Sequence, residues 1–150
     1  MHEFGHLLFC VLSGVRVYRI NLFSFGKVAG FVEHAEPHIF FQSLLISFGP
    51  LTFNSLASLI LLSQIYPPYS STLHLIELWL GFACAIHSIP SYGDARTLML
   101  LSTRRFFRNP ISIIGYPFVF VIYILNFLKR FHLHFVYAAV LFWLGNIYLK

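Results

Sequence analysis

The chain has 150 residues, of which 58% are hydrophobic and only 10% are charged, and this composition argues against a soluble globular domain and for a multi-span membrane protein. Its formal net charge of +5 is not arranged as a basic stripe interleaved with aromatic residues, so we expect no nucleic-acid partner. The basic excess fits the cytoplasmic loops of a membrane protein instead. The two cysteines lie inside apolar runs and indicate no disulfide framework.

The chain opens with the motif His2-Glu3-Phe4-Gly5-His6, which an apolar run follows at once. On a helix over residues 2–14, His2 and His6 lie four positions apart on one face, so both imidazoles can bind one cation. Glu3 then lies beside that cation, where a carboxylate can act as general base for a bound water. The alternative is a chance pair of surface histidines at a helix start. A catalytic zinc site also needs a third protein ligand.

The first apolar segment, from Phe4 to about Val17, is shorter than the roughly 20 residues that cross a bilayer. A helix that carries a buried zinc site would have further turns upstream. We therefore expect a truncated first span, with Met1 a late start or the chain a fragment. The chain begins with His and Glu instead of a basic region, which predicts no cleavable signal peptide.

The next segment changes character, because apolar residues alternate and two glycines punctuate the run. This pattern predicts a short membrane-associated β-hairpin near residues 15–32. By the positive-inside rule the hairpin faces the cytoplasm, since it carries Arg16, Arg19 and Lys27.

A long apolar run from Ile39 to Ile65 predicts a spanning helix that is bent or irregular near Gly49-Pro50. Asn54 lies within it and either joins helices or belongs to a site. The uncharged turn over residues 66–72 is expected on the non-cytoplasmic side.

The segment from Leu73 to Tyr92 predicts another span, and Asp94, the one aspartate of the chain, follows its end. The next loop is basic, so this end should lie on the side of the hairpin, near the two motif histidines. Asp94 is therefore the candidate third ligand. The alternative is a helix-end residue that pairs with Arg96 or is solvated.

Two further aromatic-rich spans are predicted over Ile111–Leu128 and Phe131–Leu149, with Asn126 and Asn146 as packing residues. The expected fold is mainly α: a multi-span membrane helical bundle of about four to five spans, the first truncated, with the short hairpin. We expect a single domain over residues 1–150, with a catalytic core over 1–96 and accessory spans over 97–150.

The motif of residues 2–6, followed by Gly14-Val15-Arg16-Val17 and Phe25-Gly26-Lys27, resembles the opening of the site-2 protease family of intramembrane zinc metalloproteases. In that family a β-hairpin comes next, then a span with a Gly-Pro pair and a downstream Asn, and later a segment with Asn, Pro and Asp. The corresponding residues occur here in the same order, and the resemblance covers residues 2–96: Gly49-Pro50, Asn54, Pro90 and Asp94.

The resemblance implies that Zn²⁺ is held by His2, His6 and Asp94. It also implies that Glu3 activates the water and that Asn54 and His87 contact the substrate or the transition state. His87 stands where the family usually has Asn, and Ala95 stands where Gly is common. His87 either replaces the amide as a hydrogen-bond donor or is a buried histidine whose hydrogen bonds are satisfied.

The implied function is hydrolysis of peptide bonds in or near transmembrane segments of a membrane-protein substrate. The enzyme would be an integral, multi-pass protein of the lipid bilayer, expected in the cell membrane, with its active site toward the cytoplasmic face. Two other classes stay open: a catalytically inactive relative that acts as a regulator or scaffold, and a metal or small-solute transporter. A transporter predicts acidic residues in several spans, and Glu77 is the only one in a span besides Glu3. The sequence leaves the oligomeric state undetermined.

Overall fold

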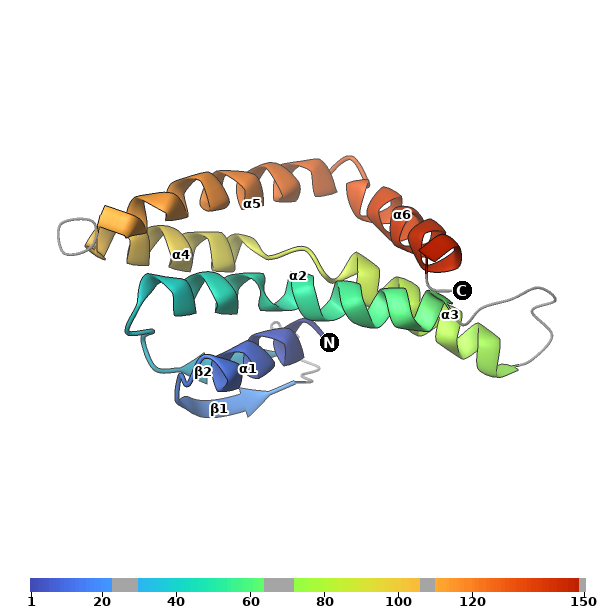
Figure 1. Cartoon of the computed structure of the whole chain (residues 1–150), viewed down its shortest axis with the longest axis horizontal. Coiled ribbons are helices and arrows are strands. Elements are labelled where there is room, and N and C mark those ends of the chain that lie inside the picture. The colour runs from blue at the N-terminus through green and yellow to red at the C-terminus, as the bar shows by residue number, and fades with distance from the viewer. Residues whose placement is uncertain (23–29, 64–71, 106–109, 149–150) are drawn as a thin grey trace.

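The computed structural model describes residues 1–22, 30–63, 72–105 and 110–148, and within these ranges the chain is mainly helical with one small sheet. Figure 1 shows the long helices lying side by side, with the sheet and the first helix on one side of them. The prediction of a mainly α fold with a short two-stranded sheet near its start is confirmed.

The N-terminal part consists of helix α1 (His2–Leu12) and the strands β1 (Val17–Asn21) and β2 (Phe31–His34). The two strands pair in antiparallel register, with an irregularity near the start of β1. Strand β2 ends at His34, whereas the sequence predicts that the hairpin ends near residue 32. The connection between the strands, including Lys27 and the Phe25-Gly26-Lys27 match, lies outside the described residues.

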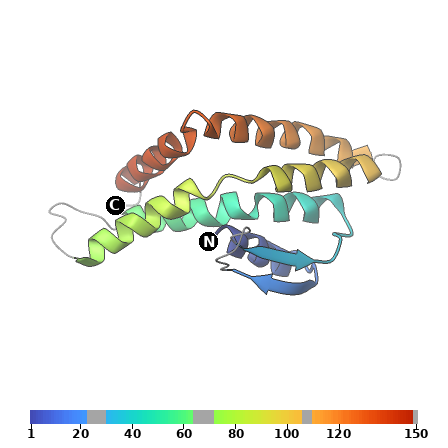
Figure 2. The same cartoon turned by 180° about the vertical axis from the view of Figure 1, so that it is seen from behind.

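Helix α2 (Phe40–Ser63) is the centre of the arrangement. Helix α1 and the hairpin lie on one side of it, and α4 and α5 lie on the other, as two opposite views show (Figures 1 and 2). The apolar run over Ile39–Ile65 thus forms one helix, which continues through Pro50, where the sequence predicts a bend or an irregularity. Proline has no N–H, so the carbonyl of Ile46, four residues earlier, lacks its usual helical donor.

The crossing of α1 over α2 brings the two backbones into contact. A Cβ atom on Gly5 would lie 2.6 Å from the Cα atom of Pro50, and one on Gly49 would lie 2.7 Å from the Gly5 oxygen. Only residues without a side chain fit at such a crossing. This close approach holds the turn of α1 that carries both motif histidines against α2.

The prediction of a span over Leu73–Tyr92 is wrong at its end. Helix α3 (Thr72–Ile86) stops earlier, and a separate helix, α4 (Tyr92–Arg105), occupies a region whose basic residues predict a loop. The physical reason for the break is Pro90, which has no N–H and disfavours helical backbone at the residue before it.

Helix α4 forms because its residues separate into two faces. Ala95, Leu98 and Leu101 are buried, whereas Arg96 and Arg104 are exposed. This is the spacing of an amphipathic helix. Asp94 therefore lies at the start of α4 and not at the end of a preceding span.

The C-terminal part contains the short 3₁₀ helix η1 (Pro110–Ile114), α5 (Gly115–Lys129) and α6 (Leu133–Tyr148). Helix α5 packs along α4, and α6 packs on α2 and α3. One buried apolar cluster joins α2, α4 and α5: Phe40, Ala95, Leu98, Val119 and Ile122.

Two helices among the described residues are long and apolar enough to cross a membrane: α2 and the stretch Pro110–Lys129. Only 33% and 28% of their apolar windows are buried inside the protein, whereas the core helix of a soluble protein is mostly buried. Helices α3 and α6 have 15 and 16 residues. Both are shorter than the ~20 residues a span needs. Among the described residues, two helices thus have the length and composition of membrane spans, and the expected number of four to five spans stays a prediction.

Candidate metal centre

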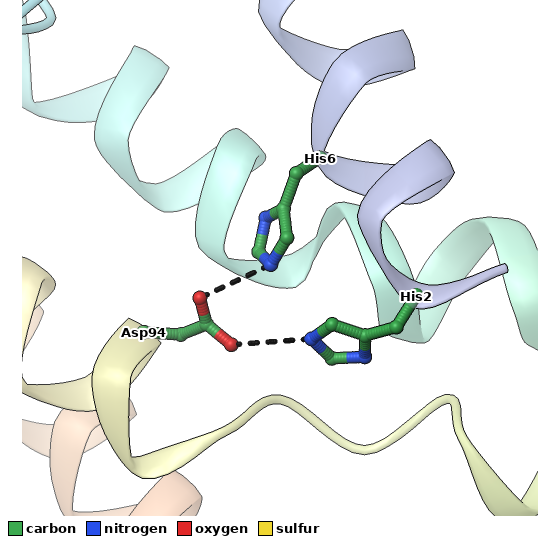
Figure 3. Close-up of side chains that lie close together, drawn as sticks. All are labelled: His2, His6 and Asp94. Carbon is green, nitrogen blue, oxygen red and sulfur yellow. Dashed lines mark ion pairs between the residues drawn. The ribbon is translucent and has the colours of Figure 1, made fainter. Parts of the chain in front are cut away.

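His2 and His6 lie one turn apart on α1 and face Asp94 in the first turn of α4 (Figure 3). The Nε2 atom of His6 is 3.1 Å from Asp94 Oδ1, and that of His2 is 3.5 Å from Asp94 Oδ2. One ligand atom from each of the three residues lies within 4.8 Å of the other two. The three side chains are between 11% and 23% exposed, so solvent still reaches this sheltered cluster.

The orientation of His6 is set by α2. Its Nδ1 lies 2.9 Å from the carbonyl oxygen of Ile46, to which it donates a hydrogen bond because a carbonyl can only accept. This is the carbonyl that Pro50 leaves without a helical donor. The proline in α2 thus provides the acceptor that turns the other ring nitrogen, Nε2, toward Asp94.

The orientation of His2 is set by the segment between α3 and α4. Its Nδ1 donates to the carbonyl oxygen of His87 at 2.9 Å. The same oxygen accepts a hydrogen bond from Asn54 Nδ2 at 3.2 Å. Asn54 is fully buried, so α2 holds this carbonyl in place from inside the bundle.

These hydrogen bonds determine which ring nitrogen of each histidine faces the carboxylate as an acceptor. With Nδ1 as the donor, a neutral imidazole carries its lone pair on Nε2. Both lone pairs then point toward carboxylate oxygens, which also only accept. Such an arrangement is repulsive unless protons or a cation lie between the groups. A histidine whose other N–H is held by a backbone carbonyl is the usual ligand form in zinc sites, so the three residues fit a zinc ion.

Asp94 is held by the residue that caps α4. Ser91 donates from its backbone N at 2.6 Å and from its Oγ at 2.8 Å to Asp94 Oδ2, and the Asp94 N–H donates back to Ser91 Oγ at 3.2 Å. This reciprocal pair is a capping box with Asp as the acidic residue. Both donors of Ser91 are directed at Oδ2, so Oδ1 is the oxygen with more capacity to bind a cation.

The charge state of Asp94 follows from these contacts. Burial by itself raises the pKa of the Asp94 carboxyl, but hydrogen bonds from His2, His6 and Ser91 and the charge of His6 outweigh it. The pKa therefore lies well below its usual range. The alternative of a solvated residue or an Arg96 partner does not describe Asp94, since the described residues contain no such ion pair and the side chain is only 15% exposed.

A cavity of about 340 Å³ opens beside the cluster, and its lining includes His2, Glu3, His6 and Asp94 together with residues of β2 and α2. Glu3 thus faces the same space as the three candidate ligands. A second hollow of about 270 Å³ shares lining residues with the first: His34, Pro37, Thr97 and Leu101. The two hollows therefore adjoin each other between β2 and α4, and we call them together the groove between β2 and α4.

The two expected substrate contacts lie elsewhere. Neither Asn54 nor His87 is among the residues that line the cavity. Asn54 contacts the cluster only indirectly, because it donates a hydrogen bond to the His87 carbonyl oxygen that also accepts from His2. The His87 side chain is exposed, so the alternative of a buried, satisfied histidine is wrong. Its backbone oxygen, not its imidazole, contacts the site.

Sequence reasoning missed three contributors: the Ile46 carbonyl, Ser91 and the His87 carbonyl. Two of them have a signal that could be read from the sequence. A proline within a helix frees the carbonyl four residues earlier, and Ser followed three residues later by an acid is a helix-start pattern.

No known protein family, curated protein or solved structure matches this chain significantly.

Proposed function

We propose that this chain is an intramembrane zinc metalloprotease of the site-2 protease type, which hydrolyses peptide bonds in or near transmembrane segments of membrane proteins. One observation carries the proposal. The Nδ1 atoms of His2 and His6 each form a hydrogen bond with a backbone carbonyl, so the Nε2 atoms of both rings face the carboxylate of Asp94. The same donor set lines a cavity with Glu3. Ligands, an acid–base residue and space for a substrate thus occur together.

In this proposal His2, His6 and Asp94 would hold the zinc ion. A bound zinc ion supplies a Lewis acid that lowers the pKa of a bound water and polarises a peptide carbonyl. Glu3 accepts the proton of the attacking water and returns it to the leaving amine. Ser91 holds the Asp94 carboxylate ionised and oriented throughout.

The groove between β2 and α4 is the proposed path of the substrate. A transmembrane helix has no spare backbone donors or acceptors, so its segment must be unwound before hydrolysis. The described residues contain no strand on the second edge of β2, because the sheet consists of β1 and β2 alone. An unwound segment can pair with that edge and satisfy its backbone groups there.

The proposed setting is a multi-pass membrane protein with the site toward the cytoplasm. The length and composition of α2 and of Pro110–Lys129 support spans there. Arg104 lies 4.0 Å from Glu36, so the end of α4 and the end of the hairpin are together. With Arg16 and Arg19 in the hairpin, arginines gather at this end, as they do at cytoplasmic ends, although Glu33 and Glu36 pair with two of them.

The first experiment measures zinc per chain in detergent-purified protein. We expect about one zinc per chain in the wild type and a clear loss in His6→Ala and Asp94→Asn. Asn keeps an acceptor for Ser91, so this substitution separates the ligand role of Asp94 from its capping role. His38→Ala, an exposed histidine outside the cavity lining, is the control and should retain zinc. A folded wild type without zinc would refute the proposal.

The second experiment measures hydrolysis of a panel of transmembrane peptides in detergent micelles by the zinc-loaded protein. Glu3→Gln should bind zinc normally and lose at least about 100-fold in rate, because the general base is gone. Glu77→Gln in α3 is the matched control and should keep its rate. Zinc binding without any hydrolysis by the wild type would favour the inactive regulator or scaffold.

A further inference from the structure

The segment between α3 and α4 is non-helical, and side chains from other helices hold its carbonyls. The His87 oxygen accepts from His2 and Asn54, as described above. The Ile89 oxygen accepts from Lys129 Nζ at 3.1 Å, and the Pro90 oxygen accepts from Asn126 Nδ2 at 2.8 Å. We call residues 87–91 the connector. Three of its carbonyls are therefore held by α1, α2 and α5.

Physical chemistry explains why the connector needs these donors. Backbone outside helices and strands leaves carbonyl groups without partners, and each such group is costly in an apolar bundle. Asn126 is 8% exposed, and its amide donates both to Pro90 and to Ile122 of its own helix at 2.9 Å. The second bond fixes the rotamer, so the first holds the connector at a defined position.

The connector leads directly to the candidate ligand. Ser91 follows Pro90, and its backbone N–H and hydroxyl hold Asp94 Oδ2. Helix α5 also packs on α4 through the cluster that includes Ala95 and Ile122. The position of the Asp94 carboxylate relative to α1 is thus determined partly by α5, a helix that contributes no residue to the cavity.

We propose that Asn126 and Lys129 are positioning residues of the metal centre. They act through the connector and hold Asp94 where it meets His2 and His6. This inference rests on the metal-binding part of the proposed function. It gives α5 a role in the site, whereas the sequence predicts accessory spans over residues 97–150 and a packing role for Asn126.

The experiment compares variants that remove only the contact to the connector. Asn126→Leu and Lys129→Met keep the size of the side chain and remove the donor. Asn146→Leu is the matched control, because Asn146 donates at 2.8 Å to Phe142 of its own helix. Zinc dissociation constants are measured by chelator competition in detergent, and visible spectra are recorded for the Co²⁺-substituted proteins. Melting temperatures are recorded without metal.

We expect zinc to bind about tenfold or more weakly in Asn126→Leu and Lys129→Met, as for other groups that orient metal ligands. The cobalt spectrum should change in both variants, because the geometry of the ligands changes. Asn146→Leu should keep the wild-type affinity and spectrum even where its melting temperature falls. Lys129→Arg retains a donor and should recover most of the affinity.

Two outcomes would overturn the inference, and they can be told apart. Wild-type zinc affinity and cobalt spectra in both α5 variants would show that Asn126 and Lys129 only stabilise the fold. A wild type that binds neither metal would remove the proposed function and this inference with it. Lys129→Met decides the matter if Asn126→Leu does not fold, because Lys129 is the less buried of the two residues.

Discussion

The Nδ1 atom of His6 lies 2.9 Å from the carbonyl oxygen of Ile46, the residue four positions before Pro50 in α2. In an uninterrupted helix that oxygen would accept from the N–H of residue 50. Because Pro50 has no N–H, this oxygen accepts a hydrogen bond from His6 instead. The same proline thus interrupts the hydrogen bonding of α2 and sets the orientation of a candidate metal ligand.

Pro50→Ala should separate these two roles. Alanine restores an N–H that competes with His6 for the Ile46 carbonyl, so the ring loses its fixed orientation. We expect zinc affinity to fall about tenfold, while thermal stability stays the same or rises because the helix gains a bond. Isothermal titration calorimetry measures the first quantity and circular dichroism the second. Pro117→Ala, an exposed proline in α5, is the control, and equal zinc affinity in both variants would contradict the prediction.

Gly5→Ala should weaken the fold and the site together. The added Cβ would meet Pro50 Cα at 2.6 Å and Pro50 N at 2.7 Å, and backbone atoms cannot move aside as a side chain can. We expect a loss of about 1–3 kcal/mol in the free energy of unfolding, measured by denaturant titration. At Gly145 the nearest atom would be 3.2 Å away, so Gly145→Ala should cost less. A Gly5→Ala protein as stable as the wild type would mean that α1 does not cross α2 here.

Ser91→Ala should loosen Asp94 without removing it. The substitution deletes the hydroxyl that donates to Oδ2 and caps α4, but leaves the backbone donor in place. We expect a loss of about 1 kcal/mol in stability and weaker zinc binding. Ser91→Thr keeps a hydroxyl and should retain both. Measurement of unfolding with and without zinc distinguishes the two effects, and a variant with unchanged zinc affinity would show that the cap does not orient the ligand.

Zinc binding should weaken as the pH falls. The pKa of Asp94 is well below its usual range, so this carboxylate stays ionised at any pH near neutral, and its contribution to stability is lost only as the pH falls through that low value. Burial lowers the pKa of His6, but the hydrogen bond and charge of Asp94 outweigh it and raise that pKa, so a proton on His6 Nε2 must leave when zinc binds. Calorimetry near neutral pH in two buffers of different ionisation enthalpy should reveal proton release, and no release would contradict a protonated His6 beside Asp94 in the metal-free protein.

Local patterns in the sequence are enough to predict several parts of this protein. The spacing of His2 and His6 on one helix face, the long apolar helix and the short hairpin all depend on residues a few positions apart. The missed helix α4 also has a local signal. Its capping residues Ser91 and Asp94 mark the start, although its basic residues resemble those of a loop.

Only the tertiary structure decides what completes the centre. The contact of Asp94 with the two histidines joins residues about ninety positions apart, and the carbonyls of Ile46 and His87 act through backbone atoms that every residue type has. Pro50 marks the Ile46 carbonyl as an acceptor without a helical donor, but no side-chain pattern identifies which donor will reach it. Such carbonyls become available where Pro50 and Pro90 interrupt hydrogen bonding, and which donors reach them depends on how α1, α2 and α5 pack.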